Sequence, residues 1–239
     1  MTSEPRIRVT ALRKTFGSHR VLDGLDVDVR EGEAVALLGA NGAGKTTLLK
    51  ILATLVRPTS GTAIVAGHDC AKDAERVRHE IGLIAHASYV YEDLTALENL
   101  RFWTTLAGLR PSAAALASAL GSVELDRAAD ERVRTFSAGM KRRLSLARFV
   151  LARPQVLLLD EPFAGLDQRA KKWLEEHLAS FKARGGAILM ATHSFGRELA
   201  VADRIAILAG GAIALDTPRG ALSADDVQRL YGLHTEDAP

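Results

Sequence analysis

Residues 39–46 read Gly39-Ala40-Asn41-Gly42-Ala43-Gly44-Lys45-Thr46, a glycine-rich run that gives the strongest indication of the fold. It matches the P-loop pattern, in which a glycine, four variable residues and a second glycine precede a lysine and a serine or threonine. The run Glu33–Leu38, apolar after its first residue, predicts a buried strand before the loop. Thr46–Val56, closed by Pro58, predicts a helix after it. A strand, a glycine-rich loop and a helix in this order indicate a phosphate-binding turn.

The residues of this loop predict contacts with a nucleoside triphosphate. Glycines let the backbone curl so that its N–H groups point at phosphate oxygens, and the start of the helix adds a partial positive charge. We expect Lys45 to reach the β- and γ-phosphates, Thr46 to bind Mg²⁺ through its hydroxyl, and Thr47 to add a phosphate contact. The alternative is a glycine-rich turn that binds nothing.

A second apolar run, Val156–Leu159, ends in two adjacent carboxylates, Asp160 and Glu161. Adjacent acids at the end of a buried strand are costly unless they face a cation or take part in proton transfer. We expect Asp160 to hold Mg²⁺, directly or through water, and Glu161 to act as the general base toward the attacking water. The alternative is a strand capped by solvated acids.

His193 follows a third apolar run, Ala187–Ala191. Its imidazole is therefore expected at the carboxyl end of a central strand, where open α/β sheets bind their ligands. There it can donate a hydrogen bond to the γ-phosphate and sense its presence. A purely structural histidine is the alternative.

Strand and helix patterns alternate along most of the chain, which predicts an α/β fold with a mostly parallel sheet covered on both faces. Strands are expected at 156–160, 187–192 and 205–208, and a helix at Gln168–Arg184. Apolar residues near period two between Ile7 and Val29 predict short strands of an N-terminal antiparallel subdomain. A hairpin is expected to turn at Gly210-Gly211.

The pattern changes to helix after helix between Tyr89 and Leu151. We interpret residues of about 89–151 as an α-helical lobe inserted between two strands of the core. With this lobe, the chain 1–239 is interpreted as a single domain that ends in a short tail of about 217–239. The closing residues 234–239 are expected to be frayed.

Composition narrows the class of protein. The chain has 47% hydrophobic and 25% charged residues, as globular proteins do, and its formal net charge of +2 predicts no nucleic-acid partner. We find no secretory signal, and the apolar runs are far shorter than the roughly 20 residues that span a bilayer. Any membrane spans are therefore expected in another chain. The single cysteine, Cys70, fits a reducing cytoplasm and is interpreted as a free structural thiol.

Five motifs resemble the ABC transporter ATPase family in their order and spacing. They are the P-loop, FSAGMKRRLSLAR at 136–148, VLLLDEP at 156–162, Ala-Gly-Leu-Asp at 164–167 and Ala-Thr-His at 191–193. The resemblance implies a P-loop NTPase core of ABC ATPase type, with ATP and Mg²⁺ as cofactors and ATP hydrolysis as the activity. It also implies a head-to-tail homodimer with its catalytic sites at the interface.

The resemblance assigns roles at that interface. Ser137 and Gly139 reach across to the γ-phosphate bound on the opposite subunit, and the loop at Asp167 links the two sites. Ser137 is also well placed as a helix N-cap, and capping alone is the alternative for it.

The chain departs from the family pattern in three places. Ala138 and Met140 replace a glycine and a glutamine of the signature motif. Phe16 stands where a tyrosine usually stacks on adenine, and it keeps the aromatic face; a plain core position is the alternative. His86 stands where a glutamine usually contacts Mg²⁺ and the attacking water. An imidazole could orient water or ligate the metal, and the alternative is a loop histidine without a catalytic role.

His86, followed by the segment Tyr91–Phe102, looks like the ATP-binding subunit of the haem exporter of cytochrome c maturation. This likeness implies a cytoplasmic subunit, peripheral on the inner face of the cell membrane, that pairs with a multi-span permease and powers export. The alternatives are a multidrug or polysaccharide exporter and a soluble ATPase of iron-sulfur assembly.

A stripe of apolar residues follows His86. Leu97, Leu100 and Leu106 share helical spacing with the aromatic pair Phe102 and Trp103. We expect most of the stripe to be core, with one aromatic exposed in a groove for the membrane partner.

Overall fold

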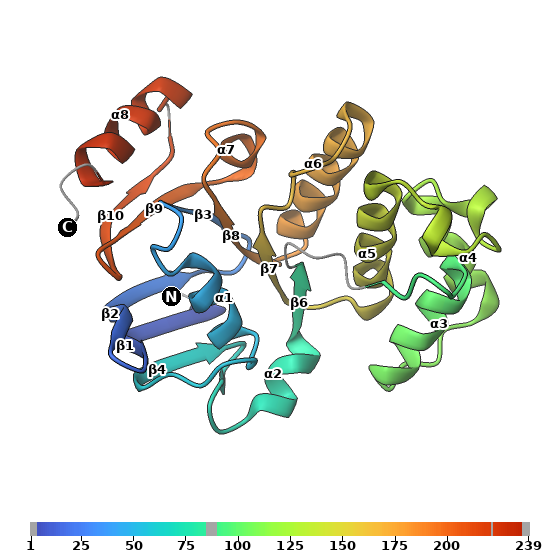
Figure 1. The fold of residues 1–239 in the computed structure, drawn as a ribbon, viewed down its shortest axis with the longest axis horizontal. Helices are drawn as coiled ribbons and strands as arrows, with labels where there is room; N and C mark the ends of the chain where they lie inside the picture. The colour runs from blue at the N-terminus through green and yellow to red at the C-terminus, as the bar shows by residue number, and fades with distance from the viewer. Residues whose placement is uncertain (1–3, 85–89, 221, 236–239) are drawn as a thin grey trace.

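The computed structural model describes residues 4–84, 90–220 and 222–235, and its strands form two sheets (Figure 1). The smaller sheet has the order β2-β1-β4-β5 and is antiparallel throughout. Its strands are β1 (Ile7–Phe16), β2 (His19–Val29), β4 (Ser60–Val65) and β5 (His68–Asp69). The predicted N-terminal antiparallel sheet is confirmed, but β1 and β2 are long strands rather than short ones.

The larger sheet has the order β10-β9-β3-β8-β7-β6. The neighbouring strands β9, β3, β8, β7 and β6 pair in parallel. The strand β10 closes the edge as an antiparallel hairpin with β9. The bounds are β3 (Ala34–Gly39), β6 (Ile81–Ile84), β7 (Val156–Asp160), β8 (Ala187–Thr192), β9 (Arg204–Ala209) and β10 (Ala212–Pro218). The mostly parallel sheet and the hairpin are therefore confirmed.

Helices cover both faces of this sheet, which explains why β3, β7 and β8 are buried along their whole length. Val156 and Leu158 face a core shared with α1 (Lys45–Leu52) and the smaller sheet. Leu157 and Leu159 alternate with them and pack on the other face, against α6 (Gln168–Ala183). The helices α2 (Ala74–Glu80) and α7 (Arg197–Val201) complete the layers.

The helix after the P-loop is shorter than predicted. It spans Lys45–Leu52 instead of Thr46–Val56, because the chain turns back at Thr54, where φ is +61°. The N–H groups of Leu55 and Val56 both donate to the Lys50 carbonyl, at 2.8 and 3.2 Å, and so close the helix before Pro58 is reached.

The segment interpreted as a C-terminal tail contains regular secondary structure. Residues up to Pro218 belong to β10, and Ala224–Thr235 form the helix α8. Val227 is fully buried against the strands β3 and β9, so packing holds this helix on the core. Residues 236–239 lie outside the described part of the chain.

Three helices lie between β6 and β7 in the sequence: α3 (Ala96–Leu106), α4 (Ala113–Ser122) and α5 (Ala138–Ala152). Two 3-10 turns, Asp126–Ala128 and Val133–Thr135, connect α4 to α5. Figure 1 shows the three helices grouped at the end of the molecule farthest from the smaller sheet. We keep the name helical lobe for these helices as an interpretation of the chain's organisation.

The apolar stripe on α3 is less buried than expected. Leu100 is buried and Leu97 is half-buried, but Leu106 is 67% exposed and Phe102 is 40% exposed. Leu106 therefore lies outside the core, whereas the expected single exposed aromatic of the stripe is Phe102, with Trp103 half-buried beside it. The rings of Phe102 and Trp103 lie 4.6 and 6.5 Å from the ring of Tyr91, which is itself exposed.

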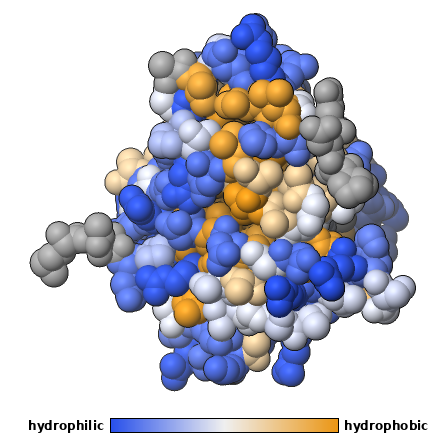
Figure 2. All heavy atoms as spheres, turned by 90° about the vertical axis from the view of Figure 1, so that its left-hand side faces the viewer, coloured by the Kyte–Doolittle hydropathy of each residue, from blue (hydrophilic) through white to orange (hydrophobic). Residues whose placement is uncertain are grey.

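Figure 2 looks at the side of the molecule that carries α8 and β10, and it shows apolar surface through the middle of this face. Leu215 on β10 and Leu230 on α8 are half-buried against the core. Among the described residues, none of the helices combines the length and the apolar character that crossing a membrane requires.

Candidate functional site

The P-loop joins the carboxyl end of β3 to the first turn of α1, and close packing requires two of its glycines. Gly44 has φ +109°, and a Cβ at this position would lie 2.7 Å from Cδ2 of Leu22. A Cβ on Gly39 would lie 2.8 Å from the Leu208 carbonyl oxygen. Glycine is therefore the only residue that fits these two places without moving a neighbour.

Lys45 is buried beneath this loop, with 7% of its surface exposed. Its Nζ donates to the carbonyl oxygens of Gly39, at 2.5 Å, and Ala40, at 3.0 Å. Burial lowers the pKa of Lys45, and the nearby charges of Glu161 and Asp160 oppose that shift. The ammonium group thus rests on neutral carbonyls, ready to exchange them for an anion.

Thr46 and Asp160 bring two oxygen ligands together from α1 and β7. The Thr46 hydroxyl donates to Oδ2 of Asp160 at 2.9 Å, and Asp160 is only 7% exposed. Mg²⁺ binds oxygen ligands in an octahedron at about 2.1 Å, which places adjacent ligands about 3.0 Å apart. The pair therefore fits two neighbouring positions around Mg²⁺, which commonly fills its remaining positions with water and phosphate oxygens.

Glu161 lies in an unusual backbone conformation, with φ +49°, directly after β7. Its Oε1 lies 2.6 Å from Nδ1 of His193 and accepts a hydrogen bond from the His193 backbone N–H at 3.0 Å. Its Oε2 accepts from the Thr192 hydroxyl at 3.1 Å. Strained backbone often marks a functional position, and here it turns the carboxylate toward the end of β8.

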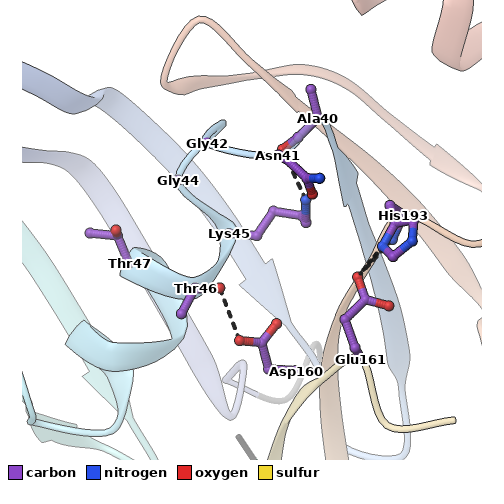
Figure 3. Close-up of a pocket in the computed structure, with 10 residues that line it drawn as sticks. All are labelled: Ala40, Asn41, Gly42, Gly44, Lys45, Thr46, Thr47, Asp160, Glu161 and His193. Atoms are coloured by element: carbon purple, nitrogen blue, oxygen red, sulfur yellow. Dashed lines mark hydrogen bonds and ion pairs between the residues drawn. The ribbon is translucent and has the colours of Figure 1, made fainter. Parts of the chain in front are cut away.

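These side chains line one cavity of about 400 Å³ (Figure 3). The lining residues are Ala40, Asn41, Gly42, Gly44, Lys45, Thr46, Thr47, Asp160, Glu161 and His193. The predicted P-loop, the two carboxylates and the histidine are therefore brought together at the carboxyl edge of the sheet. Gly39 and Ala43 belong to the same loop without lining the cavity. His86 lies outside the described residues.

The predicted interface residues lie elsewhere on this single chain. Ser137 caps α5, where its Oγ accepts from the Met140 N–H at 3.2 Å, and Gly139 lies in the first turn of that helix. Asp167 caps α6, where its Oδ1 accepts from the Ala170 N–H at 2.8 Å. None of the three lines the cavity.

Phe16 closes β1 with 49% of its surface exposed, and the Lys14 Nζ lies 4.5 Å from its ring centre. The alternative of a core position for Phe16 is therefore wrong. Its ring has an open face, which an adenine requires.

Two residues that contribute to the site were not predicted as site residues from the sequence. Arg142, in the middle of α5, donates to the backbone carbonyls of Asp160 and Glu161, at 3.4 and 3.2 Å. Burial lowers its pKa to about 10, against the opposing effect of the Asp160 charge. Thr192 is fully buried beside Glu161. The signal that could have found them is their position inside two of the quoted motifs, 136–148 for Arg142 and 191–193 for Thr192.

The fold and the cavity define a P-loop nucleotide-binding protein of α/β class. The family model described as ABC transporter matches residues 22–164, well over half of the chain. The chain therefore belongs to the ABC transporter family. This membership confirms the predicted class of enzyme, an ATP hydrolase of ABC type.

Similar proteins of named function are ATP-binding proteins of drug resistance and of Nod factor export. The daunorubicin resistance ATP-binding protein DrrA2 of Streptomyces coeruleorubidus is 42% identical over 217 residues, covering 90% of this chain and 67% of that protein. The doxorubicin resistance ATP-binding protein DrrA of Mycobacterium tuberculosis is 40% identical, covering 86% of this chain and 63% of that protein. The Nod factor export ATP-binding protein I of Ralstonia nicotianae is 36% identical, covering 96% and 74%. The chain thus spans about two thirds of the length of the two drug-resistance proteins.

Solved structures agree as well. A solved structure of the ATP-binding subunit of an ABC transporter is similar to this chain with a TM-score of 0.82 and 32% identity. The similarity covers 95% of this chain and 94% of that one. The ATP-binding cassette MJ1267 in its ADP conformation has a TM-score of 0.79 at 20% identity, which shows the shared fold. The predicted fold class is confirmed by these likenesses.

Proposed function

We propose that this chain is the ATP-binding and ATP-hydrolysing subunit of an exporter, acting as a homodimer docked on a multi-span permease. The observation that carries the proposal is the cavity itself. It gathers a phosphate-binding loop, a buried lysine, an oxygen pair of Mg²⁺ geometry and a strained carboxylate at one edge of the sheet. Family membership supports the same activity.

Binding begins at the P-loop. The phosphates of ATP lie against the loop N–H groups, and Lys45 exchanges its two carbonyl partners for the β- and γ-phosphate oxygens. Thr46 and Asp160 hold Mg²⁺, whose positive charge offsets the charge that develops on the phosphates. Arg142 holds the carbonyls of the two acidic residues in place, so that the carboxylates keep their direction.

Hydrolysis then needs a base, and Glu161 supplies it. Its carboxylate contacts Thr192 and His193 in the structure. The His193 side chain is 64% exposed and therefore has room to turn toward the γ-phosphate, which releases one Glu161 oxygen to accept a proton from water. Its backbone N–H keeps the carboxylate oriented meanwhile.

The dimer completes the site. Ser137 and Gly139 lie outside the cavity of their own chain, so a contact with bound phosphate requires a second subunit. At the N-terminus of α5 they carry the partial positive charge that attracts the γ-phosphate across the interface. Asp167, at the start of α6, is proposed to link the two sites, and Phe16 to stack on adenine. Because ATP contacts both subunits, its binding favours the closed dimer.

The names of the relatives bear on the cargo. They are drug-resistance and Nod factor export proteins, and they support the alternative of a multidrug or polysaccharide exporter over haem export. We therefore propose export of a drug-like compound, with the subunit at the inner face of the cell membrane. His86 as a replacement for the usual glutamine remains a prediction, and so does its place beside Mg²⁺.

One experiment tests the subunit role. The Glu161→Gln variant, which keeps ATP bound, is purified from native membranes with MgATP present. A multi-span protein is expected to purify with it, and light scattering is expected to show a dimer after detergent extraction. A monomer without a membrane partner, under conditions in which ATP binding is measured directly, would contradict the proposal.

A further inference from the structure

A second and larger cavity opens at the opposite edge of the sheet, where the parallel strands begin. Its volume is about 690 Å³, within the range of about 300–1,000 Å³ that small-molecule sites occupy. It lies in front of the first residues of β7 and β8, between the last turns of α5 and α6. The strand β7 separates Gln155 from Asp160 by about 16 Å, so this cavity is distinct from the nucleotide site.

One wall of this cavity is apolar. It is formed by two aromatic rings, two aliphatic side chains and a proline: Phe149, Phe181, Val150, Leu157 and Pro154. Phe181 and Leu157 are buried, which fixes their positions. Gly186 keeps the Phe181 ring in place, because a Cβ there would lie 2.1 Å from that ring. The wall can therefore receive a planar or aliphatic body.

The other wall is basic. Arg6, Arg153, Arg184 and His177 line it, and the lining contains no acidic residue. Glu31 lies nearby and pairs with Arg6 at 2.8 Å, which neutralises one of these charges. Arg153 and Arg184 form no ion pair with any residue that the structure describes; Arg184 only donates to the Ser180 hydroxyl, at 2.5 Å. Two guanidinium groups therefore remain uncompensated at one hollow.

His177 adds a hydrogen-bonding group to this wall. Its ring stacks on Trp173 with centroids 4.9 Å apart. Burial, and then the charge of Arg184, lower its pKa, so the imidazole is neutral at pH 7. It can donate or accept a hydrogen bond without adding charge.

The ends of the two helices explain part of this arrangement. Arg153 and Arg184 are the C-caps of α5 and α6, and a cation is stabilised at a helix C-terminus. That effect accounts for one arginine at each end. It does not account for the hollow that both share, or for its apolar wall.

We propose that this cavity binds a small amphiphilic anion, in which a carboxylate, sulfonate or phosphate group is joined to an aromatic or aliphatic body. The acidic group pairs with Arg153 and Arg184, and the body packs on Phe149 and Phe181. An occupant contacts the last turns of α5 and α6 together, and thereby joins the helical lobe to the core.

The test compares two dyes with the same ring system on the full-length chain without nucleotide. 8-Anilinonaphthalene-1-sulfonate carries the anion, and N-phenyl-1-naphthylamine lacks it. Both affinities are measured by fluorescence titration for the wild type, Arg153→Gln, Arg184→Gln and the control Arg110→Gln, which removes an exposed charge outside the cavity. Each cavity variant is expected to weaken binding of the sulfonate by about tenfold. The affinity for the neutral dye is expected to be unchanged in these variants. The control variant Arg110→Gln is expected to bind both dyes like the wild type.

Two further variants make the result decisive. Arg153→Lys and Arg184→Lys keep the charge and are expected to bind the sulfonate more tightly than the glutamine variants do. Val150→Trp fills the hollow and is expected to weaken both dyes. The proposal is overturned if the sulfonate binds Arg153→Gln and Arg184→Gln as tightly as the wild type, if these two variants weaken both dyes alike, or if Val150→Trp changes the binding of neither dye. Because nucleotide is absent, these results are independent of the proposed ATPase activity.

Discussion

Nδ1 of His193 lies 2.6 Å from Oε1 of Glu161, so the candidate base of the site is in direct contact with the residue that follows β8. The backbone N–H of His193 donates to the same oxygen, at 3.0 Å. The carboxylate is thus bound at one oxygen by His193 and at the other by Thr192. We infer that ATP binding has to break part of this arrangement before water can be activated.

Replacing Glu161 with Gln is expected to reduce phosphate release from MgATP by at least about a hundredfold, because loss of a general base typically costs 10²–10⁴ in rate. ATP binding, measured separately by thermal shift, is expected to remain. Glu176→Gln, at an exposed position of α6, is the matched control. Undiminished phosphate release in the Glu161 variant would exclude it as the base.

Substitutions at two glycines of the P-loop distinguish the stability cost of backbone strain from the cost of a steric clash. Gly42 has φ +86° with open space around it, so Gly42→Ala is expected to cost about 1–2 kcal/mol of stability from strain alone. Gly44→Ala adds a clash with Leu22, which is expected to cause a further loss of about 1–3 kcal/mol of stability. Urea unfolding measures both. Equal losses would show that Leu22 moves aside freely.

Ser137 has a cap role in this chain and a proposed phosphate role in the dimer. Ser112 caps α4 in the same way, with its Oγ accepting from the Ala115 N–H at 3.2 Å. Ser137→Ala and Ser112→Ala are each expected to lower the unfolding free energy by about 1 kcal/mol. Only Ser137→Ala is expected to weaken the ATP-dependent dimer, measured by light scattering. If both variants dimerise like the wild type, capping is the whole role of Ser137.

Cys70 is expected to be unreactive in the folded protein. Burial, and then the charge of Asp69, raise the pKa of its thiol to about 12, from a value of 9.0 when exposed. The unfolded chain therefore loses this proton first, so the contribution of the neutral thiol to stability is present below pH 9.0 and is lost as the pH rises toward about 12. At pH 8, a disulfide reagent such as DTNB is expected to label Cys70 only after urea unfolding. Rapid labelling without urea would contradict its burial.

Local sequence pattern was enough for the main strands and for most of the site. Apolar runs such as Val156–Leu159 predict buried parallel strands, and the carboxyl ends of parallel strands meet at one edge. That rule places Asp160, Glu161 and His193 beside the P-loop without coordinates. Helix ends were less well predicted, as at Thr54, because they depend on backbone turns that many residues can make.

The motif at 39–46 was sufficient to indicate a phosphate-binding protein, because its glycines, its lysine and its threonine all suit phosphate binding at the start of a helix. Only the tertiary structure decided which groups hold that site together. Arg142 on α5 reaches the carbonyls of Asp160 and Glu161 at the end of β7, and Thr46 meets Asp160 across 114 residues of chain. The basic cavity likewise arises from two helix ends that are brought together by packing. Contacts of this kind depend on how layers pack, and sequence spacing carries no record of that packing.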